Sequence, residues 1–335
     1  MLTGQISAPG QILLSNIDIP EPGPKDILIK VRRAGICGTD IHILHGSYPA
    51  QYPLIPGHEF SGTIEMVGTS VTRFQPGDRV TADPNIACNR CENCQKNQIN
   101  QCLNWQGIGI TRAGGFADYV IAPEGNVYPI GSISFEEGAF IEPLACVIWG
   151  IQTIRPTIGD RTLIFGAGPM GCLIMQSLKA AGATEVTIID RLPSRLKKAA
   201  SLGADHTLLT EEAPSVLKNL SPDGFDIVTD ATGSPSVVES CFQYVRARGK
   251  VWLFGVCTPD AKASFSPYEV FRKDLSIFGS YAVNRTFNES IELLRSGTVK
   301  VRPLLSHTLP LEDFAAAMRV AEHDPKRMKV QLYWD

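Results

Sequence analysis

Four cysteines crowd into fifteen positions of this chain. Cys88, Cys91, Cys94 and Cys102 are separated by two, two and seven residues. Four thiolates at such spacings suit one tetrahedral Zn²⁺ that is closed to solvent, and the alternatives are unligated or disulfide-bonded cysteines and an iron–sulfur cluster. The residues around them are polar, so we expect a surface loop in which the metal has a structural role.

Two further segments carry residues that a reactive metal needs. Cys37-Gly38-Thr39-Asp40 is followed by His42, and Gly57-His58-Glu59 comes later in the chain. Glu142 stands in an apolar stretch, which favours burial over exposure. An alcohol must lose its hydroxyl proton before its carbon can give up hydride, and zinc with one open position lowers the pKa of that hydroxyl. A cysteine, a histidine and a carboxylate are suitable ligands for such an ion.

A glycine-rich stretch later in the chain is typical of dinucleotide binding. Gly166-Ala167-Gly168-Pro169-Met170-Gly171 follows a strand-like run at 161–165 and opens a helical pattern. Its glycines permit a tight turn and a close approach of the backbone to a pyrophosphate at the helix N-terminus. Asp190 is placed to accept hydrogen bonds from the adenosine ribose, which favours NAD. Arg191 and Arg195 are alternatively placed to hold the 2′-phosphate of NADP.

Two kinds of domain must position these residues. Up to residue 145, short apolar runs are broken by Gly and Pro, which is typical of a β-rich, barrel-like domain. From about residue 159, apolar runs alternate with helical patterns, which predicts a doubly wound parallel sheet in an α/β protein. We expect a catalytic zinc-binding domain over 1–145 and 283–335 and a dinucleotide-binding domain over 146–282.

Composition excludes several classes of partner. The chain has 335 residues, enough for two cores, and its net charge of −3 leaves no basic surplus for nucleic acid or an acidic membrane surface. It contains no uninterrupted run of about 18 apolar residues, and its first residues do not have the pattern of a signal peptide. We therefore expect a cytoplasmic protein that acts on a small molecule.

Together these motifs resemble the zinc-containing medium-chain dehydrogenase/reductase family along essentially the whole chain. Besides the four cysteines, the matching residues are Cys37-Gly38-Thr39-Asp40, Gly57-His58-Glu59, Pro76-Gly77-Asp78-Arg79-Val80, Gly114-Gly115-Phe116-Ala117, Glu142-Pro143-Leu144 and Gly166 to Gly171. The resemblance implies a GroES-like β-rich catalytic domain, a Rossmann domain, one catalytic and one structural zinc per chain, and NAD or NADP. It also implies a dimer or tetramer joined through the run at 275–281, the expected edge of the parallel sheet.

The resemblance also implies which residues bind the catalytic zinc. Cys37 and His58 are ligands, and Glu59 or Glu142 supplies a carboxylate, directly or in exchange with water. Classical alcohol dehydrogenases of the family have a cysteine where this chain has Glu142, whereas the polyol branch has glutamates at both positions. A polyol or sugar-like secondary alcohol is therefore the expected substrate. Threonine-type, sugar-acid and sugar-alcohol-phosphate dehydrogenases are the alternatives, and a catalytically silent nucleotide-binding protein is the alternative of another class.

A proton path follows from the same resemblance. Thr39 takes the proton of the substrate, His42 carries it to solvent, and Asp40 holds His58 in the correct tautomer. The alternatives are turn or cap residues for Thr39 and Asp40 and an exposed loop position for His42. Polar residues in segments that the fold should bring near the zinc are candidates for the substrate pocket, namely Tyr48, Asn284 and Arg285.

Overall fold

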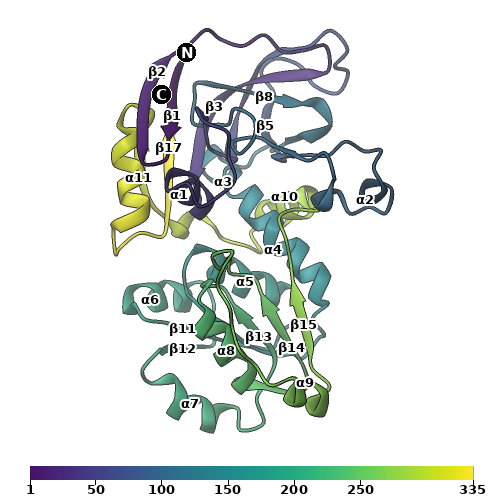
Figure 1. Ribbon diagram of the computed structural model, residues 1–335, viewed down its shortest axis with the longest axis vertical. Coiled ribbons are helices and arrows are strands. Elements are labelled where there is room, and N and C mark those ends of the chain that lie inside the picture. Colours follow the sequence, from purple (N-terminus) through teal and green to yellow (C-terminus); the bar gives the residue numbers. More distant parts are fainter. Residues whose placement is uncertain (335) are drawn as a thin grey trace. The chain divides into compact units, whose positions relative to one another are not determined.

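The chain forms two compact units that are not consecutive in sequence (Figure 1). The computed structural model describes residues 1–334. The first unit consists of Met1–Ala145, Val283–Ser296 and the residues from Val301 onward, and the second of Cys146–Ala282 and Gly297–Lys300. Hydrogen bonds between Gln176 and the backbone of Lys300 hold that last short segment in the second unit.

A seven-stranded sheet forms the centre of the first unit, with the strand order β16-β17-β3-β4-β5-β9 and β8 paired to β3. The strands are β3 (Asp26–Ile36), β4 (Glu59–Val67), β5 (Arg79–Ala82), β8 (Tyr119–Pro123), β9 (Val127–Pro129), β16 (Leu305–Pro310) and β17 (Lys329–Tyr333). Two small antiparallel pairs accompany it, β1 (Leu2–Ala8) with β2 (Gln11–Asn16) and β6 (Asn85–Ile86) with β7 (Gln106–Gly107).

The first unit also contains helices, most of them short. They are α1 (Gly38–Leu44), α2 (Glu92–Gln95), α3 (Phe135–Gly138), α10 (Phe287–Arg295) and α11 (Phe314–His323), while α4 (Ile141–Ile154) continues into the second unit. Alternate residues of β3 point into one core, where Ile27, Ile29 and Val31 are fully buried. Phe314 and Leu332 belong to the same core. The C-terminal tail therefore packs with strands from the start of the chain.

The second unit is a parallel sheet of six strands in the order β12-β11-β10-β13-β14-β15. The strands are β10 (Arg161–Phe165), β11 (Glu185–Asp190), β12 (His206–Leu209), β13 (Phe225–Asp230), β14 (Val245–Leu253) and β15 (Ser276–Gly279). The helices are α5 (Pro169–Ala180), α6 (Pro193–Ser201), α7 (Ala213–Leu220), α8 (Pro235–Tyr244) and α9 (Pro267–Lys273).

This topology confirms the predicted fold class. The strand order reverses between β10 and β13, and ligands of doubly wound sheets bind at such a switch point. The glycine-rich stretch lies directly after β10, so the sheet places it there. Across residues 1–334, every helix is too short or too polar to pass through a membrane.

Candidate zinc and nicotinamide sites

Cys37, His58 and Glu59 come together where two paired strands end. Cys37 follows β3 and is the N-cap of α1, and Glu59, the first residue of β4, pairs with Gly35 of β3. One potential ligand atom of each of the three residues lies within 4.8 Å of the other two. A thiolate, an imidazole and a carboxylate this close form a donor set that fits Zn²⁺.

A buried carboxylate supports the His58 ring. Asp40 Oδ1 lies 3.6 Å from His58 Nδ1, a buried nitrogen that has no hydrogen-bond partner among the described residues. The Asp40 carboxylate also accepts the backbone N–H groups of Cys37 at 2.8 Å and Gly57 at 3.3 Å. Burial raises the pKa of Asp40, although the neighbouring His58 opposes this. These contacts connect the Cys37 turn to the His58 turn.

The charges around His58 favour a cation. Burial by itself disfavours a charged imidazole, but Asp40, Cys37 and Glu142 raise the pKa of His58 well above its usual value. Glu142 lies in the first turn of α4 and is 8% exposed. Groups that stabilise a proton on His58 also stabilise a divalent ion at the same place. The electrostatics of the cluster therefore fit the metal.

Lys329 is a member of this cluster that the sequence did not reveal. Its Nζ donates hydrogen bonds to both carboxylate oxygens of Glu59, at 2.7 and 2.6 Å, and the residue is 5% exposed. Burial lowers the pKa of Lys329, but the charges of Glu59, Cys37 and Glu142 and the hydrogen bonds to Glu59 together outweigh it, so the pKa is raised. The pairing of Val330 with Ile36 brings this lysine beside Cys37. No local sequence motif indicates that Lys329 belongs to the cluster.

The candidate proton carriers lie on α1. The Thr39 hydroxyl is 3.8 Å from Cys37 Sγ. His42 is half-buried, and its Nδ1 lies 3.2 Å from the Ser47 hydroxyl. Tyr48, after the helix, packs against the hydrophobic core of the first unit. Thr39 thus lies beside the potential metal ligands, and His42 lies one turn further on.

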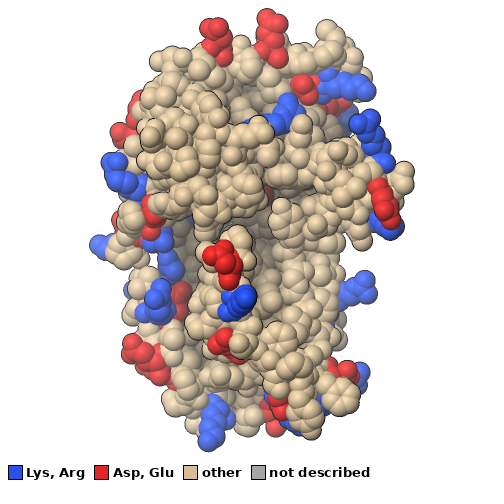
Figure 2. Space-filling view, viewed as in Figure 1, with Lys and Arg blue, Asp and Glu red and all other residues tan. Residues whose placement is uncertain are grey.

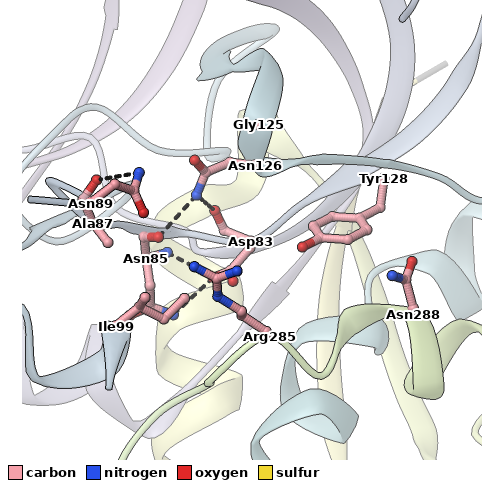
Figure 3. A pocket seen from close by; sticks show the side chains of 10 residues that line it. All are labelled: Asp83, Asn85, Ala87, Asn89, Ile99, Gly125, Asn126, Tyr128, Arg285 and Asn288. Carbon is pink, nitrogen blue, oxygen red and sulfur yellow. Dashed lines mark hydrogen bonds between the residues drawn. The ribbon is translucent and has the colours of Figure 1, made fainter. Parts of the chain in front are cut away.

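The other two substrate-pocket candidates lie near the cysteine-rich loop. Asn284 is buried, and its Nδ2 donates to the carbonyl of Asn97 in that loop at 2.9 Å. Arg285 is exposed and lines a cavity together with Asp83 and Tyr128 (Figure 3). Both residues therefore contact surroundings other than the Cys37 cluster.

The four cysteines of the loop converge on one point. Their sulfur atoms all lie within 4.8 Å of one another, and Cys91 Sγ is 3.4 Å from Cys94 Sγ and 3.9 Å from Cys102 Sγ. A tetrahedral zinc with Zn–S bonds of about 2.3 Å needs sulfur atoms about 3.8 Å apart. Burial and the neighbouring thiols raise the pKa of Cys94 to about 12, whereas backbone hydrogen bonds lower the pKa of Cys88 to about 6 and also lower that of Cys91. This geometry fits a closed zinc site.

The glycine-rich turn between β10 and α5 depends on its glycines. Gly166 has a φ of +103°, and a Cβ at Gly171 would lie 1.7 Å from the carbonyl oxygen of Gly166. Gly168 is the N-cap of α5, and Pro169 is its first residue, followed by Met170. The free N–H groups of the first helical turn therefore face the turn, an arrangement that binds pyrophosphate.

Asp190 ends β11 beside this turn. Its Oδ2 accepts the N–H of Ala167 at 2.8 Å, and its Oδ1 accepts the N–H of Leu192 at 2.9 Å. Arg195 Nη1 lies 3.8 Å from the same carboxylate, whereas Arg191 is exposed. The backbone thus fixes the carboxylate, and the carboxylate holds Arg195.

Comparison with known proteins agrees with these sites. Residues 23–132 match the alcohol dehydrogenase GroES-like domain, and residues 169–296 match the zinc-binding dehydrogenase family. The chain is 36% identical to D-altritol 5-dehydrogenase of Agrobacterium fabrum over 328 residues, 96% of each chain. It is 33% identical to D-arabinitol dehydrogenase 1 of Uromyces fabae over 316 residues, 92% of this chain and 90% of that one.

Solved structures extend the similarity to three dimensions. A zinc-binding dehydrogenase from Sinorhizobium meliloti, crystallised with NADP, has a TM-score of 0.95 and 33% identity, with 99% of each chain covered. The GroES-like and Rossmann assignments are thereby confirmed, as is the expectation of zinc and a nicotinamide cofactor. The chain therefore belongs to the zinc-containing medium-chain dehydrogenase/reductase family and is a zinc-dependent, nicotinamide-linked oxidoreductase.

Proposed function

We propose that this protein oxidises a secondary hydroxyl of a polyol to a ketone while it reduces NAD, and that it catalyses the reverse reaction. The observation that carries the proposal is the cluster of the half-buried Cys37 with the buried His58 and Glu59, on which a second glutamate, Glu142, acts. When bound, zinc lowers the pKa of the alcohol and NAD accepts the hydride. The relatives named for altritol and arabinitol support the substrate class.

Cys37, His58 and Glu59 are proposed to hold the catalytic zinc. Glu59 is favoured over Glu142 because its carboxylate lies within 4.8 Å of the other two ligand atoms. Glu142 then acts through its charge on His58 and Lys329. Lys329 holds the Glu59 carboxylate in place, which restricts it to the orientation that faces the cluster. Cys88, Cys91, Cys94 and Cys102 hold the structural zinc.

Thr39 is the proposed relay for the substrate proton, because its hydroxyl lies beside Cys37 and can accept that proton as it releases its own toward the cofactor ribose. His42, half-buried one turn later, is the proposed group that passes the proton on to solvent. Asp40 is a positioning residue, since it faces His58 Nδ1 and the Cys37 backbone. Tyr48, after α1, is the proposed contact for the remainder of the polyol.

NAD is the proposed cofactor. Asp190 lies at the end of β11 with its carboxylate fixed, where it accepts hydrogen bonds from ribose hydroxyls and repels a 2′-phosphate. Arg195 is paired with Asp190, which leaves the exposed Arg191 as the alternative contact for NADP. Gly166, Gly168 and the α5 N-terminus cradle the pyrophosphate in either case.

An initial-rate screen tests the proposal. Arabinitol, altritol, threonine, sugar acids and sugar-alcohol phosphates are offered to the zinc-loaded protein with NAD and with NADP. We expect the highest kcat/KM for an uncharged polyol with NAD. A preference for threonine, a sugar acid or a phosphorylated substrate would replace the polyol assignment, and no turnover with any alcohol would favour the catalytically silent alternative.

A homo-oligomer is proposed from the edge of the parallel sheet. β15 is the outermost strand there, and Phe271, Ile277 and Tyr281 beside it are 82%, 39% and 50% exposed. Pairing of β15 with a second copy covers this edge in a dimer, from which a tetramer can form. Sedimentation velocity should then show that Ile277→Asp shifts the protein toward monomer. None of the nine cysteines, all within residues 1–334, forms a disulfide, which suits a reducing compartment, so a cytoplasmic location is proposed.

A further inference from the structure

A polar cavity of about 390 Å³ lies in the first unit, between the cysteine-rich loop and the segment before α10 (Figure 3). Its volume is within the range of small-molecule sites. A carboxylate, a phenol, a guanidinium and asparagine amides are among the lining groups, contributed by Asp83, Tyr128, Arg285, Asn126 and Asn288.

Hydrogen bonds fix one wall of this cavity. Asp83 is 3% exposed, and its Oδ1 accepts both the backbone N–H and the side-chain Nδ2 of Asn85 at 2.9 Å. Asn126 Nδ2 donates to the carbonyls of Asp83 and Asn85, both at 2.9 Å. Trp105 Nε1 donates to Asn85 Oδ1 at 3.0 Å. The wall is therefore rigid before any ligand binds.

Three charged or polar groups face the cavity with hydrogen-bonding capacity that residues 1–334 do not use. They are Asp83 Oδ2, the Tyr128 hydroxyl and the Arg285 guanidinium, and Figure 3 labels all three residues among those that line the cavity. The Tyr128 ring stacks on Phe287 with centroids 5.0 Å apart, which fixes the direction of its hydroxyl. Burial raises the pKa of Asp83 to about 6, so keeping a carboxylate here reduces stability at neutral pH.

The mixture of charges selects the chemistry of the ligand. A phosphate or carboxylate would be repelled by Asp83, and a metal ion would be repelled by Arg285. A hydroxyl group both donates and accepts, so it can donate to Asp83 while it accepts from Arg285 or Tyr128. A neutral compound with several hydroxyls satisfies all three groups.

We propose that this cavity binds a neutral polyhydroxyl compound, a polyol or a sugar, at a site separate from the metal cluster. None of Cys37, His58 and Glu59 lines the cavity, and neither do Asp40 and Lys329, which contact that cluster. A ligand here contacts Arg285 on one side and the segment after β5 on the other.

Calorimetric titration of the Cys37→Ser variant with D-arabinitol tests this site without the catalytic metal site. We expect binding that Asp83→Asn and Tyr128→Phe, added singly, each weaken about tenfold, the effect of losing one hydrogen bond of about 1.4 kcal/mol. Asp83→Asn preserves the Oδ1 acceptor that the fold uses. Tyr119→Phe, at a half-buried tyrosine of β8, is the matched control and should not change binding.

Kinetics of the otherwise wild-type Asp83→Asn enzyme give the second readout. The KM for D-arabinitol should be unchanged. A rise in KM as large as the rise in the dissociation constant would assign the cavity to the catalytic site and overturn the proposal. Absence of arabinitol binding, binding that neither variant weakens, or preferred binding of inorganic phosphate or Mg²⁺ would also overturn it. If Cys37→Ser does not fold, the same titrations use the zinc-loaded protein without NAD. Because these titrations need no turnover, they separate this site from the proposed polyol oxidation.

Discussion

Lys329 and Glu59 form a buried ion pair, in which Nζ lies 2.7 and 2.6 Å from the two carboxylate oxygens. The residues are 270 positions apart, yet 5% and 1% exposed. Their contact makes the C-terminal strand part of the metal cluster. Removing one partner of such a pair leaves a buried charge without compensation, which destabilises a protein by about 3–5 kcal/mol.

Lys329→Met is therefore expected to lower the free energy of unfolding by about 3 kcal/mol or more, and Glu59→Gln should do the same. In the double variant neither charge remains, so we expect much of the loss to be recovered. Chemical denaturation of the four proteins measures this coupling. Lys326→Met replaces an exposed lysine and should have little effect. Strictly additive losses would contradict the pairing.

The zinc content of the same double variant tests the ligand assignment. If Glu59 is the carboxylate ligand, the Glu59→Gln/Lys329→Met protein should retain the structural zinc and bind the catalytic zinc weakly. Metal analysis after dialysis against a mild chelator should then give about one zinc per chain. If the double variant retains two zinc ions per chain, the carboxylate ligand is Glu142 and not Glu59.

Cys91→Ala should remove the structural zinc and lower the thermal stability, because three thiolates bind zinc less tightly and the loop loses a metal-held closure. The affected protein should contain one zinc per chain. Cys257→Ala, which replaces a half-buried thiol that belongs to neither cluster, is the control. The closed-site interpretation is wrong if Cys91→Ala melts at the wild-type temperature with two zinc ions bound.

Asp190→Ala should lower kcat/KM for NAD by about tenfold, since the ribose hydroxyls lose their acceptor. It should raise kcat/KM for NADP, because it removes a charge that repels the 2′-phosphate. Arg191→Ala, made in the wild-type background, should lower kcat/KM for NADP more than kcat/KM for NAD. The ratio of kcat/KM for the two cofactors measures both effects. A wild-type preference for NADP that Arg191→Ala abolishes would show that the arginine, and not Asp190, determines cofactor choice.

Asp83→Asn should stabilise the protein at neutral pH. The pKa of Asp83 is about 6 in the folded protein and 3.8 ordinarily, so the folded state binds the proton more tightly. The contribution of Asp83 to the free energy of unfolding therefore falls as the pH rises from about 4 to 6. The total fall is about 3 kcal/mol. Urea denaturation at both ends of this window should show a growing advantage of the variant. A difference in the free energy of unfolding between the two proteins that does not change with pH would contradict the raised pKa of Asp83.

Local patterns explain how much was predictable from the sequence. The strand before Gly166 and the helix after it are neighbours in the chain, so the sequence pattern predicted the turn between them. The alternation of apolar runs with helical patterns predicted the parallel sheet. The spacing of Cys88 to Cys102 likewise predicts one site, because short loops bring the thiols together. The roles of Thr39, His42, Asp190 and the zinc ligands remain predictions, now with a geometry that fits them.

Long-range pairing explains what the sequence could not indicate. Lys329 reaches Glu59 only because β17 lies against β3, and no residue near it carries a motif. Asp83 and Tyr128 share a cavity with Arg285 because segments far apart in the chain meet there. The N-terminal hairpin of β1 and β2 was not expected either, since its second strand is mostly exposed and lacks a buried apolar face.

The most direct test of the account compares zinc content and polyol oxidation in the wild-type protein and in Cys37→Ser. The wild type should contain about two zinc ions per chain and reduce NAD when a polyol is added. Cys37→Ser should keep one zinc and bind NADH, but show no polyol-dependent reduction. Full activity in Cys37→Ser, or a wild-type protein with two zinc ions that oxidises no polyol, would contradict the account.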